Sequence, residues 1–396
     1  MTITINNKNK KPNVPNLRFK EFEGEWKEST IGEMFDLYSG NTPSRLNKEH
    51  FKGTVNWISS GELKEHYIYS SKEQISEEAA KSLKLLPVGT FVIAIYGLEA
   101  EGVRGTGSIT QEPSTISQAC MSFIPKGVIE NEFLYSWYKK HGNVIGIRYA
   151  QGTKQQNLSY DILEKFRIAY PNTKEQEKLN KFISLLDERI ATQSKIIEKM
   201  QTLIKGIVDS TILRKEKNAI VGDVCSISEQ IRAEANIDDI ITVRLHGNGV
   251  CKSSAENLQL GATQYYRRRA GQLIYGKQNF HNGAIGIVPI SLDNGITSKD
   301  IPSFDIDEMK CNSVYLLAQL QSPQYYKPAE ALTTGTGSKR LKEETFLKMP
   351  IVLPNKREQD NIATLIISIS ANLDQAKKML DLFSIQKQYL LRQMFI

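Results

Sequence analysis

Apolar side chains recur at steps of three and four residues along two stretches of the chain. The first stretch comprises Leu179, Phe182, Leu186, Ile190, Ile197, Met200, Ile204 and Ile207, with a polar interruption at Gln193. The second comprises Ile362, Leu365, Ile369, Leu373, Ala376, Leu380, Phe383 and Leu390, with an interruption at Lys387. Each set falls on one face of an α-helix, so the spacing predicts long helices over 173–213 and 356–396.

One apolar stripe on each helix requires a partner surface. We predict that the two helices pack against each other as an antiparallel coiled coil, because the apolar spacing stays regular over their whole length. The residues expected at this interface are Leu179, Leu186, Ile190, Ile197, Ile204, Leu365, Ile369, Leu373 and Leu380. The alternative is that each amphipathic helix packs on its own domain.

Outside the helices, short apolar runs alternate with glycine-rich turns. FVIAIY (91–96) and AIGIVPI (284–290) are typical of strands, and SVYLLAQL (313–320) fits a strand or a helix. Each globular part is therefore expected to have a mixed α/β fold.

The chain contains an internal repeat at a shift of 183 residues. GTKQQNL (152–158) and KFRIAYPNTKEQ (165–176) align without gaps with GTGSKRL (335–341) and KMPIVLPNKREQ (348–359). Weaker matches upstream keep the same order in both halves. This duplication predicts two globular units, each followed by one long helix and related by a pseudo-twofold axis.

Composition fits this picture of a folded, multidomain protein. The chain has 396 residues, of which 40% are hydrophobic and 24% charged, as in a globular protein of two or three domains. No apolar run is long enough to cross a bilayer and the N-terminus is polar, so we expect a cytoplasmic protein without membrane contact. The four cysteines form no C-x-x-C pair, which argues against a zinc knuckle.

Catalytic signatures are missing from the sequence. It has no G-x-x-x-x-G-K-[ST] loop, no H-E-x-x-H, and no Asn-Pro-Pro-aromatic tetrapeptide, and its five histidines are scattered without metal-ligand spacing. We therefore expect no catalytic residue, no metal site and no cofactor in this chain. A centre assembled from distant residues remains the alternative.

Polar loops rich in hydrogen-bond donors are the remaining candidates for function. The formal net charge of +7 is spread thinly over nearly neutral domains, so any contact with DNA must come from local groups that bind phosphates or base edges. The candidates are Ser39, Asn41, Thr42, Ser44, Arg45, Ser60, Lys64, Arg104, Thr106, Lys154, Gln156, Asn157, Lys277, Asn279, His281, Thr336, Ser338, Lys339 and Arg340. Ordinary turn chemistry explains any single loop equally well. Arg267-Arg268-Arg269 fits either a phosphate-binding strip or a solvated charge run.

The duplicated plan, together with SGNTPSR (39–45), NWISSGEL (56–63), GTKQQNLS (152–159) and YPNTKEQ (170–176), resembles the specificity subunit of type I restriction-modification systems. The resemblance implies two target-recognition domains that each read one half of a split site in double-stranded DNA, spaced by an antiparallel coiled coil. It also implies a non-catalytic chain that recruits two methylation subunits and restriction subunits. S-adenosylmethionine, for N6-adenine methylation, and ATP and magnesium are expected in those partners.

The resemblance assigns boundaries along the chain. Residues 1–16 are expected to be a disordered polar tail, 17–170 and 215–350 the two recognition domains, and 171–214 and 351–396 the central and distal long helices. Two other functions remain open. A self-sufficient DNA-modifying enzyme would bind a methyl donor or a metal itself, and a pure scaffold would bind no DNA.

Overall fold

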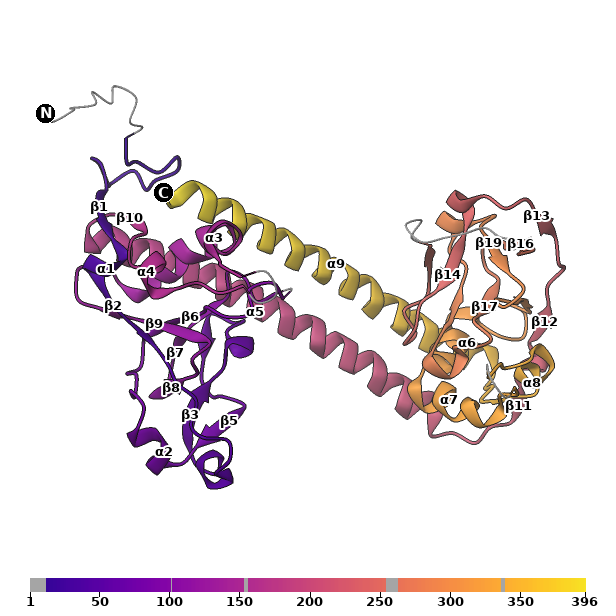
Figure 1. The fold of residues 1–396 in the computed structure, drawn as a ribbon. Helices are drawn as coiled ribbons and strands as arrows, with labels where there is room; N and C mark the ends of the chain where they lie inside the picture. The colour runs from indigo at the N-terminus through magenta and orange to yellow at the C-terminus, as the bar shows by residue number, and fades with distance from the viewer. Residues whose placement is uncertain (1–11, 101, 153–155, 254–262, 336–338) are drawn as a thin grey trace, which may run out of the picture. The chain divides into compact units, whose positions relative to one another are not determined.

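The computed structural model describes residues 12–100, 102–152, 156–253, 263–335 and 339–396. The chain divides into two compact units (Figure 1). Unit 1 comprises residues up to Gln193 together with Met379–Ile396, and unit 2 comprises Ser194–Lys378. Unit 1 is therefore built from two separate segments of the chain, whereas unit 2 is one continuous segment.

Unit 1 contains a five-stranded sheet in the order β2-β9-β6-β7-β4. Its strands are β2 (Phe35–Ser39), β9 (Cys120–Pro125), β6 (Phe91–Ala94), β7 (Gly107–Thr110) and β4 (Tyr67–Ile68). A smaller sheet has the order β5-β3-β8, formed by Glu73–Ile75, Val55–Ile58 and Ser114–Ile116, and β1 (Lys27–Thr30) pairs with β10 (Arg167–Tyr170). The helices are α1 (Ile31–Met34), α2 (Glu77–Lys81), α3 (Asn131–Tyr149) and α4 (Tyr160–Leu163), with short 3-10 turns η1 (Lys48–Phe51) and η2 (Ser60–Glu62).

The core of unit 1 forms where α3 packs on the large sheet. Strand β6 is buried at every position, as expected for a continuous apolar run in the middle of a sheet. The ring of Phe91 from this strand lies 5.9 Å from that of Tyr135 and 5.8 Å from that of Tyr138, both from α3. This packing fixes α3, and with it the loops at both of its ends.

Unit 2 contains a four-stranded sheet in the order β12-β20-β17-β18. Its strands are Cys225–Ile227, Ser303–Ile306, Leu273–Tyr275 and Ile285–Ile287, in that order. A smaller sheet has the order β13-β16-β19 (Arg232–Ala233, Tyr265–Arg267 and Ile296–Ser298), β14 (Ile241–Val243) pairs with β15 (Val250–Lys252), and β11 (Ala219–Ile220) with β21 (Pro350–Ile351). The helices are α6 (Ser313–Leu320), α7 (Pro323–Tyr326) and α8 (Glu343–Leu347), with 3-10 turns η4 (Val221–Asp223), η5 (Ile237–Asp239), η7 (Phe280–Asn282), η8 (Ile290–Leu292) and η9 (Lys327–Leu332).

The two units repeat one topology. The order β2-β9-β6-β7 in unit 1 has its counterpart in β12-β20-β17-β18 in unit 2, and the pair β1·β10 has its counterpart in β11·β21. All of these pairings are antiparallel. The prediction of a mixed α/β fold for each globular part is confirmed.

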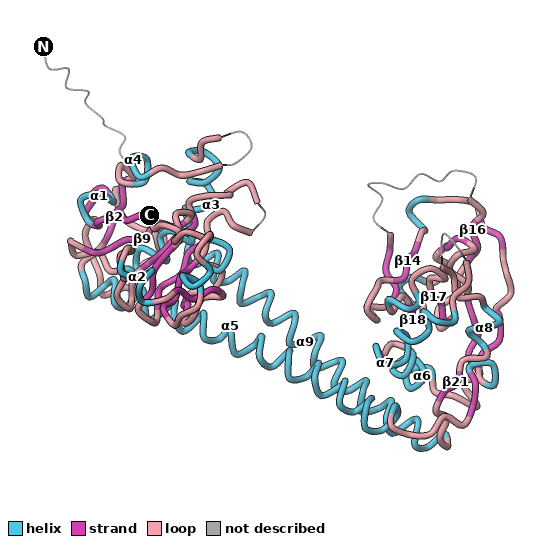
Figure 2. Tube along the Cα trace, turned by 60° about the horizontal axis from the view of Figure 1, so that its bottom comes forward, coloured by secondary structure: helices cyan, strands magenta, loops and turns pink. Residues whose placement is uncertain are grey.

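The long helices are α5 (Thr173–Val208), which continues into one π-helical turn over Asp209–Leu213, and α9 (Lys356–Met394). Asn172 and Asn355 cap them, because each side-chain oxygen accepts a hydrogen bond of 3.0 Å from the backbone N–H three residues ahead. Helix α5 passes from unit 1 into unit 2, and α9 passes from unit 2 into unit 1. Within each unit a segment of α5 lies beside a segment of α9 (Figure 2).

The paired segments run antiparallel within each unit. In unit 1, Leu179, Ile183 and Leu186 of α5 share a core with Leu390, Leu391 and Met394 of α9. In unit 2, the core contains Val208 at the end of α5 and Ile212 in the π-helical turn that follows it. The same core contains Ile362, Ala363 and Ile366 from the start of α9.

The apolar seam differs from the sequence pattern at one residue. Leu365, expected at the interface, is 47% exposed, whereas its neighbour Ile366 is only 7% exposed and takes the inward position. A straight helix turns 3.6 residues per turn, so its buried face drifts from a strict heptad and residue 366 rather than 365 follows Ile362. Leu373 is buried as well, and Ile190, Ile197, Ile204, Ile369 and Leu380 are half-buried.

Of the expected tail over 1–16, residues 1–11 lie outside the described residues, and residues 12–16 are described. The backbone N–H of Leu17 donates to the carbonyl of Gln393, and the Asn16 side chain donates to that of Gln393. Arg18 forms two hydrogen bonds, of 2.7 and 2.8 Å, with the buried carboxylate of Glu175. This stretch is ordered because its contacts with α5 and α9 replace those that a free tail makes with water.

None of the helices formed by the described residues is both long enough and apolar enough to span a membrane.

Candidate nucleic-acid interface

A hairpin in unit 1 borders a polar hollow at the edge of the large sheet. The backbone N–H and C=O groups of Gln151 and Asn157 pair with each other at 2.8 Å in both directions. A hollow of about 500 Å³ adjoins them, lined by Ser39, Ile95, Tyr96, Met121, Gln151, Gly152, Asn157, Leu158, Ser159 and Tyr160. The side-chain oxygen of Asn157 is buried and has no hydrogen-bond partner among the described residues. This hollow contains no formal charge, and its polar groups are hydroxyls and amides.

A matching hairpin in unit 2 borders a charged hollow. Thr334 and Arg340 pair through their backbones at 3.0 Å in both directions. The adjoining hollow of about 460 Å³ is lined by Lys277, Lys299, Asp300, Thr334, Gly335, Arg340, Lys342 and Glu343. Lys277 forms an ion pair of 2.7 Å with Glu343, and Arg340 forms one of 3.0 Å with Asp300. Cations outnumber carboxylates in this lining by four to two.

The two hollows occupy the same place in the repeated fold. Residues 151, 152, 157 and 160 correspond to 334, 335, 340 and 343 at the shift of 183 residues. The buried leucine after each hairpin also makes the same contact, since Leu158 donates to the carbonyl of Ile95 and Leu341 to that of Lys277. One scaffold thus presents a neutral lining in unit 1 and a cationic lining in unit 2, and these linings suit different ligand groups.

Other predicted residues in unit 1 gather near the first hairpin. Arg104 donates to the side-chain oxygen of Gln156 over 3.0 Å, and the backbone N–H of Gln156 donates to Glu99 over 2.7 Å. That hydrogen bond lowers the pKa of the Glu99 carboxyl. Thr106 is used locally, because its hydroxyl donates to the carbonyl of Val103. Arg104 and Gln156 therefore support each other at the side of the hairpin.

The SGNTPSR loop forms a separate, rigid group. Arg45 makes two hydrogen bonds of 2.7 and 2.8 Å with Glu73, which lower the pKa of that carboxyl, and its guanidinium stacks 4.4 Å above the ring of Phe51. Asn41 and Thr42 are engaged by residues outside the loop, because the Asn41 carbonyl accepts from the indole of Trp57 and the Thr42 hydroxyl donates to Gln118.

The remaining candidates differ in their exposure and in their contacts. Ser44 and Lys64 are exposed, and Ser60 begins η2. Lys339 forms an ion pair of 3.0 Å with Glu330, whose pKa it lowers together with the nearby His281. Asn279 accepts a hydrogen bond from Asn282, to which His281 also lies close. Lys154, Thr336 and Ser338 lie outside the described residues.

Sequence reasoning missed part of both linings. Tyr96 and Tyr160 line the first hollow, and Lys299 and Lys342 line the second. The repeat could have identified two of these residues. Tyr160 aligns with Glu343, which lines the second hollow, and Lys342 aligns with Ser159, which lines the first. Across the described residues, no group of three or more His, Cys, Asp or Glu side chains is placed to hold a metal ion.

Comparisons with known proteins agree with this geometry. The family of the type I restriction modification DNA specificity domain matches residues 23–202. The chain is 32% identical over 176 residues to the specificity subunit of the type I restriction enzyme EcoR124I/EcoR124II from Escherichia coli, covering 43% of each chain. It is 29% identical over 185 residues to the MjaIX specificity subunit from Methanocaldococcus jannaschii, covering 44% of this chain and 42% of that protein. The matched parts thus span less than half the length of these two relatives.

The fold of a solved structure extends the likeness to both units. The S subunit of a type I restriction-modification system from M. genitalium superimposes with a TM-score of 0.62 at 14% sequence identity, and the match covers 97% of this chain and 99% of that one. The predicted resemblance is confirmed by these findings. Residues 23–202 thus match a type I restriction modification DNA specificity domain, and the chain as a whole shares the fold of a solved S subunit.

Proposed function

We propose that this chain is a non-catalytic subunit that recognises a bipartite DNA target through its two units. The observation that carries the proposal is the repeated hairpin hollow, which has the same backbone frame in both units but a neutral lining in one and a cationic lining in the other. Two recognition surfaces that share one backbone arrangement but carry different side chains suit two half-sites of different sequence. The target is therefore expected to be split and asymmetric.

The two linings suit different contacts with DNA. In unit 2, Lys299, Lys342 and Arg340 provide cations for phosphate oxygens, whose contacts position a protein without reading sequence. In unit 1, the amide of Asn157 and the hydroxyls of Ser39 and Tyr160 provide neutral donors and acceptors of the kind that pair with base edges. Each unit needs contacts of both kinds, and the surrounding loops supply the rest.

The long helices are proposed to set the distance between the two half-sites of the DNA target. Helix α9 has 39 residues, which at about 1.5 Å per residue gives a length of roughly 58 Å. That length exceeds one turn of B-DNA, which is about 34 to 36 Å. A coiled coil of this length is compatible with half-sites that are separated by a fixed spacer and lie one turn or more apart.

The same helices are proposed to carry the partner subunits. Two methylation subunits would bring S-adenosylmethionine and convert adenine to N6-methyladenine, and restriction subunits would use ATP and magnesium. This chain would position those subunits on DNA by binding both half-sites, and its own residues would take no part in bond making.

The test is to identify the sequence that the complex methylates. The chain is co-expressed with a cognate methylation subunit in a bacterial host that lacks DNA methylation, and N6-methyladenine is mapped by single-molecule sequencing. The expected result is one split motif with a modified adenine in each half. A stable complex that leaves no motif would contradict DNA recognition and favour a protein-binding scaffold.

A further inference from the structure

The arginine triplet of unit 2 separates into one buried and two exposed side chains. Arg268 is fully buried, and its guanidinium donates to Thr297 at 2.7 Å, to Ser303 at 2.8 Å and to the carbonyl of Ile301 at 2.9 Å. Neighbouring residues of an extended strand point to opposite faces. Arg267 and Arg269 are accordingly exposed.

Arg268 adds a buried charge behind this surface. Its described hydrogen-bond partners are hydroxyl, amide and carbonyl oxygens, and none is a carboxylate. Burial lowers the pKa of Arg268 to about 10, so the side chain stays protonated at neutral pH. A buried cation without a carboxylate partner makes the neighbouring surface more attractive to anions.

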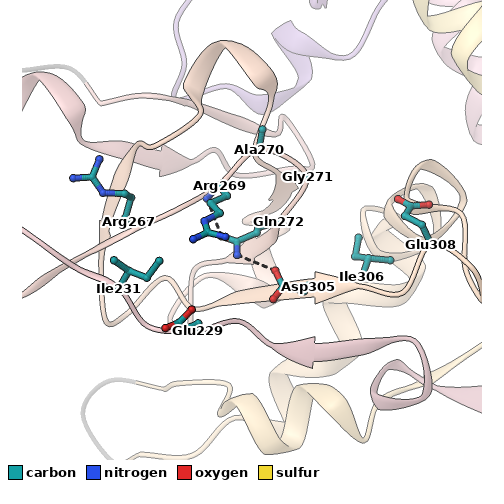
Figure 3. Close-up of a pocket in the computed structure, with 10 residues that line it drawn as sticks. All are labelled: Glu229, Ile231, Arg267, Arg269, Ala270, Gly271, Gln272, Asp305, Ile306 and Glu308. Atoms are coloured by element: carbon teal, nitrogen blue, oxygen red, sulfur yellow. Dashed lines mark hydrogen bonds between the residues drawn. The ribbon is translucent and has the colours of Figure 1, made fainter.

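Arg267 and Arg269 line a hollow of about 360 Å³ beside the small sheet (Figure 3). The backbone that carries them is fixed, because the N–H of Arg267 donates to the carbonyl of Ile231 and the N–H of Arg269 donates to the side chain of Gln272. Gln272 in turn donates to Asp305 over 2.8 Å. The two exposed guanidiniums are therefore mounted on a rigid strand end, although they themselves are free to move.

These guanidiniums differ from the cations that the sequence pattern selected. Lys277, Lys339 and Arg340 each form an ion pair with a carboxylate of unit 2, and those pairs would have to rearrange before a phosphate could bind. Arg267 and Arg269 have no ion-pair or hydrogen-bond partner for their guanidiniums within the described residues. Three carboxylates, those of Glu229, Asp305 and Glu308, also line the hollow (Figure 3), so a phosphate would meet the guanidiniums at the surface and not inside the hollow.

We infer that Arg267 and Arg269 form a second DNA contact of unit 2, in which both guanidiniums bind backbone phosphates. This inference rests on the proposed function and adds to it a surface outside the hairpin hollow. Guanidinium groups suit the role because they remain charged and donate two parallel hydrogen bonds to phosphate oxygens. The contact strengthens binding to every sequence and carries no base preference.

The test measures DNA binding by the complex of the full chain with its methylation subunit. The variants are Arg267→Ala/Arg269→Ala, Arg267→Lys/Arg269→Lys, and a control, Lys327→Ala/Lys348→Ala, which removes the same charge from exposed positions that do not line this hollow. Affinity is measured on the mapped target duplex and on an unrelated duplex over a range of salt concentrations. Size-exclusion chromatography and thermal unfolding confirm that each variant folds and assembles.

The double alanine variant is expected to bind both duplexes roughly tenfold more weakly at 0.15 M salt, and the slope of log K against log salt should become shallower by about 1.8. The lysine variant should retain most of the affinity and the slope, and the control should behave as the unmodified complex does. Unchanged binding by the alanine variant, or a loss equal to that of the control, would overturn the inference. A loss confined to the target duplex with an unchanged slope would also overturn it, since that result indicates base reading.

The unmodified complex separates this inference from the proposed function. If it binds the target duplex and only the variants behave otherwise than expected, the second contact is wrong and DNA recognition stands. If it binds no duplex at all, both are wrong.

Discussion

Two buried glutamines show how single residues position the long helices. Gln176 donates to the carbonyls of Val128 and Pro171 and accepts from the N–H of Glu130, at 3.0 to 3.1 Å. Gln359, its counterpart in the repeat, makes the equivalent bonds in unit 2, to Lys310, Pro354 and Asn312. Each side chain thus fastens the first turn of a long helix to the segment that leads into an earlier helix of its unit, α3 for Gln176 and α6 for Gln359.

Replacing either glutamine by leucine should weaken one unit selectively. Gln176→Leu leaves three buried backbone groups with fewer partners, at about 1 to 3 kcal/mol for each group left unpaired. We therefore expect faster amide hydrogen exchange in α3 and the first turn of α5, with unit 2 unaffected.

Gln359→Leu is the matched control, for which exchange should quicken in α6 and the first turn of α9. Exchange that quickens equally in both units for either variant would contradict this local role.

At the scale of elements, a buried charge network joins the globular part of unit 1 to its long helices. The ring nitrogens of His66 lie 2.8 Å from Glu132 of α3 and 3.0 Å from Asp187 of α5. Lys387 of α9 also pairs with Asp187, which explains why a lysine stands in an otherwise apolar seam. The His66 ring is stacked between Tyr67 and Tyr135, with centroids 4.0 and 3.9 Å away.

This network favours the charged form of His66. Burial opposes the charge, but the hydrogen bonds to Asp187 and Glu132 and their negative charges outweigh it and raise the pKa of His66. Asp187 shows the reverse balance, since its burial is outweighed by the hydrogen bond from His66 and by the charge of Lys387, and its pKa is lowered. Lys139 lies in the same region, and burial lowers its pKa to about 8.

The stability of unit 1 should depend on pH through His66. Because the folded pKa lies above the unfolded value of about 6.5, the stabilising contribution is complete below that pH and is lost as the pH rises through the folded value. His66→Gln should lower the free energy of unfolding by on the order of 2 kcal/mol at pH 6, and by less at pH 7.5.

Denaturant unfolding followed by exchange in α3 measures this difference. The comparison is repeated in a Lys139→Met background, because Lys139 titrates close to the same range. An equal loss at both pH values would show that the charge of His66 contributes nothing.

At the scale of the whole molecule, the two long helices are the only described elements that belong to both units. If they set the distance between the two half-sites, the length of the helices must determine the length of the spacer in the DNA target. Removing one heptad shortens a helix by about 10.5 Å, which corresponds to about three base pairs of B-DNA.

Deleting residues 196–202 together with 372–378 tests this role. Both segments belong to unit 2, and removing seven residues from each keeps the apolar faces nearly aligned. The methylated motif should keep both half-sites and lose about three base pairs of its spacer. Altered half-sites with an unchanged spacer would show that the helices do not act as the ruler.

The elements were largely predictable from the sequence, because local patterns encode them. The apolar spacing at steps of three and four residues predicts α5 and α9, and the shift of 183 residues predicts that both globular parts share one plan. The burial of Ile366 in place of Leu365 was not predictable, because both residues are apolar and only packing against a partner distinguishes them.

The candidate site was predictable only in part. The loops at 151–157 and 334–340 were among the sequence candidates. Tyr96 and Lys299, which complete the linings, come from distant segments, whereas Tyr160 and Lys342 follow the loops closely in the sequence. The arginine triplet was ambiguous in sequence, since three identical side chains give no sign of which one is buried. Sheet pairing resolved it by placing Arg268 inside and Arg267 and Arg269 outside.

The sequence by itself determined the number of units, the mixed α/β class and the long helices, because periodicity and duplication are properties of the chain alone. Only the tertiary structure decided which cations are already paired, which residues share a hollow, and why His66, Asp187 and Lys387 belong together. The physical reason is that burial and ion pairing depend on contacts between separate segments, 121 residues apart for His66 and Asp187 and 200 for Asp187 and Lys387, and no local pattern records such contacts.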